Sequence, residues 1–133
     1  MTTIRIDLPW QTPPLTLNDR RGHRAHAREV RQVRETMHWL AIRQQLPKGV
    51  AHVVIELHWL PAFRRRRDPI NVTATQKALV DALTAGTTKT PGYGLVVDDT
   101  PAYVTDLMPV IHQPGPARVR MWLELTIDQG SAA

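Results

Sequence analysis

Hydrophobic and polar residues alternate along several short segments of the chain, and this alternation has the period of a half-buried β-strand. It predicts strands over residues 4–10, 52–59 and 119–127, the last of which carries the clearest signal. The segment Tyr103–Ile111 is predicted to be a further strand, broken or bent around Pro109. Residues rich in proline, glycine and threonine separate these segments, as expected for loops.

Two segments have helical periodicity instead. Residues 24–45 contain no proline or glycine and predict a long amphipathic helix that stops near Pro47. A second helix is predicted to start between Asn71 and Thr73, both plausible N-caps, with Gly86 on its C-terminal side. The inward faces are predicted to carry Val30, Val33, Met37, Leu40 and Ile42 in the first helix and Val72, Gln76, Leu79, Val80 and Leu83 in the second.

The predicted order of elements is β-α-β-α-β-β. This order favours an α+β (mixed α/β) fold with one sheet and two main helices. At 133 residues the chain fits one domain over residues 1–133, and a hydrophobic content of 42% is enough for a core.

The composition indicates which kind of partner and which cellular compartment suit the chain. A formal charge of +5 suits a polyanion such as nucleic acid, although many small soluble proteins are also basic. The absence of cysteine excludes disulfides and thiolate metal sites and fits a reducing cytoplasm. No apolar stretch approaches the ~20 residues of a membrane span, and the first residues lack the pattern of a signal peptide. We therefore expect a cytoplasmic protein with no membrane partner.

The most distinctive segment follows the second predicted strand. Four arginines, Arg64, Arg65, Arg66 and Arg67, stand directly before Asp68-Pro69-Ile70-Asn71. Such a run is typical of a surface that contacts phosphates, and Pro69 biases Asp68 towards an extended backbone at the exit of the strand. Arginines beside a carboxylate suit a site where a polyanion is held next to a divalent metal.

Further charged residues could complete such a site. Hydrolysis of a phosphodiester needs converging carboxylates that hold Mg²⁺, usually from different elements. Asp98 and Asp99 precede the strand at 103–111, so they can meet Asp68 if the strands flanking the second helix are neighbours. Lys77 could approach the same place and contact a phosphate.

Each candidate also has an ordinary structural interpretation. Asp98-Asp99 followed by Thr-Pro is common turn chemistry, and Asp68 could simply pair with its own arginines. Asn71 could be a helix cap, and Lys77 could pair with Asp81 four residues later on the helix surface. The six histidines show no metal-ligand spacing, so none is assigned to a metal.

Together these motifs resemble a known family. The strand followed by Arg-Arg-Arg-Arg-Asp-Pro-x-Asn, then Lys-Ala-Leu-x-Asp-Ala-Leu, then Asp-Asp-Thr-Pro-x-Tyr-Val, is similar to the RusA family of Holliday junction resolvases. The opening Ile6-Asp7-Leu8-Pro9-Trp10 also resembles the family's first strand, so the likeness covers about residues 4 to 127. Members are commonly encoded by phages and prophages and act in DNA recombination and repair.

The resemblance implies a specific activity. Members of the family are Mg²⁺-dependent homodimers that bind four-way DNA junctions and nick two opposing strands symmetrically; Mn²⁺ is a possible substitute for Mg²⁺. The resemblance implies that Asp68 and Asp99, with Asp98 beside them, bind the metal. It also implies that Lys77 is the catalytic lysine. Arg64 to Arg67 would hold DNA phosphates, with Arg20, Arg21 and Arg24 as further candidates.

The chain also departs from the family pattern. The first acidic motif is usually Asp-x-Asp-Asn, but Ile70 stands in place of the second carboxylate. Asn71 or Asp98 could compensate, and the spacing from Leu83 to Asp98 is longer than usual. Two hypotheses follow: an active junction endonuclease, or a non-catalytic DNA- or junction-binding protein that Ile70 has weakened as an enzyme. A third, in which the resemblance is accidental, is a basic protein that contacts RNA or another protein.

Overall fold

The computed structural model describes residues 1–130, which form one mixed five-stranded sheet and two helices. The strands are β1 (Thr2–Leu8), β2 (His52–Trp59), β3 (Val104–Asp106), β4 (Val110–Ile111) and β5 (Met121–Asp128). The helices are α1 (His23–Arg43) and α2 (Thr73–Leu83), and a 3-10 turn, η1 (Pro69–Val72), leads into α2. The α+β class, the single sheet and the two main helices are therefore confirmed.

The order of strands across the sheet is β1-β5-β2-β3, and β4 also pairs with β2. β5 is antiparallel to both β1 and β2, whereas β3 and β4 run parallel to β2. β3 and β4 are thus neighbours of β2, which was the condition for the carboxylates to meet, and the predicted break beside Pro109 is confirmed between Asp106 and Val110. Since parallel neighbours need a crossover connection, α2 lies between β2 and β3 in the chain.

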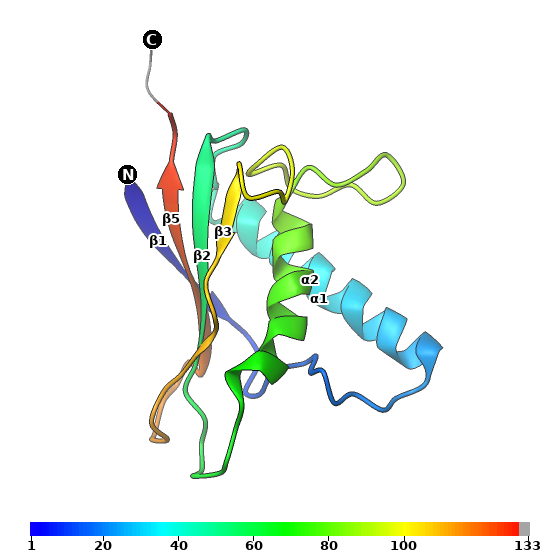
Figure 1. The fold of residues 1–133 in the computed structure, drawn as a ribbon, viewed down its shortest axis with the longest axis vertical. Coiled ribbons are helices and arrows are strands. Elements are labelled where there is room, and N and C mark those ends of the chain that lie inside the picture. Colours follow the sequence, from blue (N-terminus) through cyan, green and yellow to red (C-terminus); the bar gives the residue numbers. More distant parts are fainter. Residues whose placement is uncertain (131–133) are drawn as a thin grey trace.

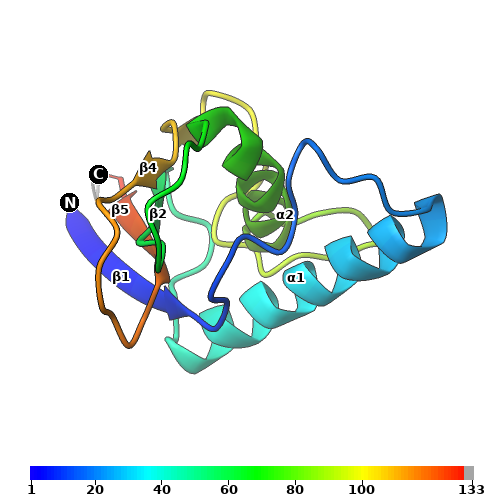
Figure 2. The same ribbon diagram turned by 90° about the horizontal axis from the view of Figure 1, so that it is seen from below.

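Both helices cover the same face of the sheet (Figure 1), and the view from below shows them side by side (Figure 2). Alternation along β2 directs Ile55 and Leu57 into the core beneath the helices, while Glu56 and His58 lie on the opposite face. One face of β2 therefore packs beneath the helices, and its other face lies on the side of the sheet that the helices do not cover.

The helix predictions hold except at the ends. α1 ends at Arg43, and its last inward residue is Ala41, which is fully buried, whereas Ile42 is 45% exposed. The predicted inward position of Ile42 is wrong because its neighbour Ala41 occupies the inward side of that last turn. The predicted inward face of α2 is confirmed, since all five of its residues are buried.

α2 starts at Thr73, within the predicted range, but its cap differs from the prediction. Neither Asn71 nor Thr73 caps it: the residue before α2 is Val72, and it provides no side-chain cap. Asp68 instead caps η1, because its Oδ1 accepts a hydrogen bond of 3.1 Å from the backbone N–H of Ile70.

The connection between α2 and β3 is held firmly against the domain. The backbone N–H groups of Tyr93 and Leu95 donate to the carbonyls of Ala82 and Leu83, and Leu95 is fully buried. Gly92 comes so close to this helix end that a Cβ would lie 1.9 Å from the carbonyl oxygen of Thr84. The segment therefore fixes where Asp98 and Asp99 emerge.

Candidate functional site

Lys77 lies at the centre of a charged cluster on α2. Its Nζ donates hydrogen bonds of 3.0 Å to Asp81 Oδ1 and 3.3 Å to Asp99 Oδ2. Asp81 follows one helical turn later, whereas Asp99 comes from the connection 84–103. Asp81 and then Asp99 raise the pKa of Lys77, and Lys77 in turn lowers the pKa of Asp99. The structure thus brings two predicted site residues together and shows the predicted helix-surface pair with Asp81 as well.

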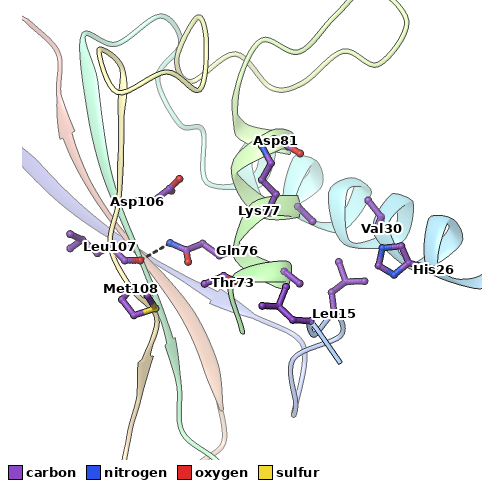
Figure 3. A pocket seen from close by; sticks show the side chains of 13 residues that line it. Leu15, His26, Val30, Thr73, Gln76, Lys77, Asp81, Asp106, Leu107 and Met108 are labelled. Carbon is purple, nitrogen blue, oxygen red and sulfur yellow. Dashed lines mark hydrogen bonds and ion pairs between the residues drawn. The ribbon is translucent and has the colours of Figure 1, made fainter. Parts of the chain in front are cut away.

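Asp106 joins this cluster from the sheet. Asp106 lies two residues after the buried Val104 in β3, so its side chain is on the face of the strand that is turned towards the helices. Figure 3 shows its carboxylate projecting towards α2, where Lys77 and Asp81 lie. Partial desolvation raises the pKa of Asp106, and the positive charge of Lys77 opposes that rise. Sequence reasoning missed Asp106, although the alternation Val104-Thr105-Asp106 could have placed it on the helix face.

The cluster borders a cavity of about 550 Å³ between α2, α1 and β3 (Figure 3). One end of the cavity is charged, with Lys77, Asp81 and Asp106, and the remainder is largely apolar. Gln76 closes part of its wall by donating a 2.7 Å hydrogen bond to the carbonyl of Leu107. Carboxylates at the rim of a cavity are accessible to ions and to phosphate groups.

Asp68 occupies a different place. It lines a separate hollow of about 710 Å³ with Arg65, Arg66 and Arg67, at the N-terminal end of α2, and Asp98 and Asp99 do not line it. Within residues 1–130 the oxygens of Asp68, Asp98 and Asp99 do not form a group within shared metal-ligand reach. The expected convergence of these three carboxylates is therefore absent, because α2 separates the loop before it from the connection after it. Nor does Asp68 form an ion pair with its arginines in this part of the chain.

The four arginines have two different roles in the structure. Arg67 is half-buried, donates to the carbonyls of Phe63 and Arg65, and stacks 4.9 Å above the ring of Trp59. Its side chain therefore holds the loop in shape. Arg64, Arg65 and Arg66 are exposed and can reach a phosphate backbone.

Other residues predicted to bind metal or DNA already have partners within the protein. Asp98 accepts a 2.8 Å hydrogen bond from the backbone N–H of Asp99, which is turn chemistry. Arg21 is paired with Asp19, and that guanidinium strongly lowers the pKa of the carboxyl. Arg21 is therefore less available to DNA than the exposed arginines after β2.

A second group lies on the other face of the sheet. Glu56, His58 and Glu124 each offer a ligand atom within 4.8 Å of the others, so they could bind a metal ion. His58 is buried, and its Nε2 lies 2.7 Å from Glu56 and 3.3 Å from Glu124. Sequence reasoning missed this group because the residues meet only through the register of β2 against β5, which sets Glu56 directly opposite Glu124.

Comparison with known families and with characterised proteins adds no relative. No family model matches the chain, and no curated protein matches it.

Proposed function

We propose that this protein is a Mg²⁺-dependent endonuclease of the RusA type, which resolves four-way DNA junctions by paired symmetric nicks. The observation that carries the proposal is the contact of Lys77 with Asp81 and Asp99, beside Asp106. These residues come from a helix, a loop and a strand. Such convergence is what metal-assisted phosphodiester hydrolysis requires.

The donor set of this cluster fits Mg²⁺. Asp81, Asp99 and Asp106 supply only hard oxygen ligands, and with Lys77 they carry two more negative charges than positive ones when ionised. Mg²⁺ bound there would neutralise phosphate charge and lower the pKa of a bound water. Within residues 1–130 the oxygens of Asp81, Asp99 and Asp106 also do not form a group within shared metal-ligand reach, so Mg²⁺ would have to draw these side chains together in place of the Lys77 ammonium. The proposal therefore moves the metal site from Asp68 and Asp98 to the carboxylates around Lys77, and it retains Asp99.

The other residues have supporting parts in the proposal. Lys77 is 65% exposed at its side chain, so its ammonium can exchange a carboxylate for a phosphate oxygen and stabilise developing negative charge. Arg64, Arg65 and Arg66 hold backbone phosphates without reading sequence. A homodimer would present two such sites to the two opposing strands of a symmetric junction.

The position of Asp68 favours a second candidate function, a junction- or DNA-binding protein without catalysis. Asp68 lies apart from Lys77, and its neighbour Ile70, 47% exposed, offers no ligand atom. If the family's metal site has to form at Asp68, this chain lacks the second carboxylate for it. This candidate predicts tight junction binding that salt weakens strongly, with no cleavage in any divalent metal.

The two functions are separated by junction cleavage with Mg²⁺ and with Mn²⁺, comparing the wild type with Ile70→Asp. The enzyme proposal expects paired nicks by the wild type and little nicking of a linear duplex of the same length. Cleavage only by Ile70→Asp would place the metal at Asp68 and support the non-catalytic candidate for the native chain. Binding without cleavage by either protein would overturn the enzyme proposal.

A further inference from the structure

The face of the sheet that no helix covers carries the group of Glu56, His58 and Glu124. We propose that these three residues form a binding site for a divalent transition-metal ion of the Zn²⁺ type, separate from the cluster around Lys77. Imidazole nitrogen together with carboxylate oxygen is a donor set that suits such ions better than Mg²⁺.

The state of His58 is the first argument. Its imidazole is nine-tenths buried, and within residues 1–130 its Nε2 makes no hydrogen bond of acceptable geometry. That nitrogen nevertheless lies 2.7 Å from Glu56 Oε1 and 3.3 Å from Glu124 Oε2. A buried polar atom without a partner is costly, so a nitrogen that faces two carboxylates favours a cation shared with them, which would enter as the 2.7 Å contact lengthens.

The pairing of the two glutamates is the second argument. Glu56 and Glu124 stand directly opposite each other on neighbouring antiparallel strands. Like charges in this position are destabilising. Arg5 stands opposite Glu124 on its other side, in β1, but within residues 1–130 it forms its ion pair with Asp7 and not with Glu124. A divalent ion bound to both carboxylates would remove that repulsion, and the half-exposed side chains leave a path for it to enter.

The neighbours of His58 favour metal ligation. Its Nδ1 lies 2.8 Å from Nε2 of His112, so one of these nitrogens donates to the other. When His58 donates through Nδ1–H, the lone pair of its Nε2 points into the group, and the hydrogen bond fixes the ring, as second partners of metal-bound histidines do. The ring of Trp122 stacks on His58 at 5.1 Å and 5°, which shields the site from water on one side.

The dimensions of the group also fit. Zn²⁺ lies about 2.0–2.2 Å from histidine nitrogen and carboxylate oxygen in tetrahedral sites, so two ligand atoms on one ion are about 3.3–3.6 Å apart. The Nε2–Oε2 distance of 3.3 Å to Glu124 matches this spacing, whereas the 2.7 Å distance to Glu56 has to lengthen. The three ligand atoms lie within 4.8 Å of one another, and small side-chain adjustments bring them into range. Because Glu56 and His58 lie on the opposite face from Ile55 and Leu57, an ion here cannot contact a phosphate at Lys77.

The test is Zn²⁺ binding to metal-stripped protein by calorimetry, with Co²⁺ as a spectroscopic probe of the same site. The wild type should bind one ion per chain, gain thermal stability with it, and give a Co²⁺ visible absorption band. His58→Gln and Glu124→Gln should each lower Zn²⁺ affinity about tenfold or more. Glu124→Gln is the safer variant because its side chain is 40% exposed and contributes little to the core.

Two controls keep the assignment specific. His52→Gln removes another histidine from the same face of β2, where His52 bonds Thr105, and it should bind Zn²⁺ as the wild type does. Asp99→Asn should also keep Zn²⁺ binding, even though the proposed nuclease site is damaged. Equal affinity in wild type and Glu124→Gln, or an equal loss in His52→Gln, would overturn the site.

Discussion

Lys77 donates a 3.3 Å hydrogen bond to Asp99, a residue 22 positions later in the chain. The bond joins α2 to the connection that follows it, and it brings together the two residues that carry most of the proposed chemistry. Asp106 lies near the same ammonium but in a more desolvated place, so the two carboxyl groups have pKa values shifted in opposite directions. This arrangement has measurable consequences for stability and for cleavage.

Asp99→Asn and Asp106→Asn should change the pH dependence of stability with opposite signs. The pKa of Asp99 is lowered on folding, so its stabilising effect is complete above the ordinary aspartate pKa of about 3.9 and is lost as pH falls. The pKa of Asp106 is raised, so its contribution is present at low pH and is lost as pH rises through the raised value. In urea unfolding from pH 3 to 7, Asp99→Asn should therefore lose stability relative to wild type mainly at neutral pH, and Asp106→Asn should gain it there. Parallel pH profiles for the two variants would contradict the arrangement.

A comparison of Asp68→Ala with Asp68→Asn should distinguish the stabilising effect of the cap from that of the carboxylate charge. Asp68 caps η1 through its Oδ1, and asparagine caps about as well as aspartate. Asp68→Ala should cost about 1 kcal/mol of the free energy of unfolding, whereas Asp68→Asn should cost little. Equal losses measured by urea unfolding would show that the carboxylate charge, rather than the cap, is what stabilises this turn.

Gly92→Ala should be among the most damaging single changes in the chain. A Cβ there would lie 1.9 Å from the carbonyl oxygen of Thr84, and backbone has to move to relieve the clash. We expect a loss of about 1–3 kcal/mol by urea unfolding and weaker positioning of Asp99. Gly115→Ala is the matched control, because nothing lies within 4 Å of its added Cβ and stability should hardly change.

Replacing exposed arginines should change DNA binding in a way that salt reveals. The double variant Arg65→Gln/Arg66→Gln should lower junction affinity and reduce the slope of log K against log salt by about 0.9 for each DNA phosphate that the protein no longer neutralises. Arg31→Gln/Arg43→Gln removes the same charge from exposed positions on α1. An equal reduction in slope in both double variants would mean that net charge alone, and not the loop after β2, determines binding.

Much of the fold could be predicted from the sequence because alternation and helical spacing are local. Strands β2 and β5, the inward face of α2 and the break beside Pro109 all follow from such patterns. Helix ends follow less well, since a shift of one position, as between Ala41 and Ile42, reverses which residue is buried.

The candidate site could be predicted only in part. Lys77 and Asp99 were expected together and lie together, but Asp68 does not join them, because its distance from Asp99 depends on how α2 packs between the two loops. The group of Glu56, His58 and Glu124 depends on the register of two strands more than 60 residues apart. No local spacing in the sequence carries that information.

The most direct measurement of the central claim is the rate of four-way junction cleavage in Mg²⁺ by wild type and Asp99→Asn. Asp128→Asn serves as the control, because Asp128 is an exposed carboxylate of β5 outside the Lys77 cluster, and asparagine can still accept its hydrogen bond from Gly130. We predict paired symmetric nicks by the wild type, a loss of about 100-fold or more in Asp99→Asn, and a control rate close to wild type. Cleavage by Asp99→Asn at the wild-type rate would show that Asp99 is not part of the catalytic site.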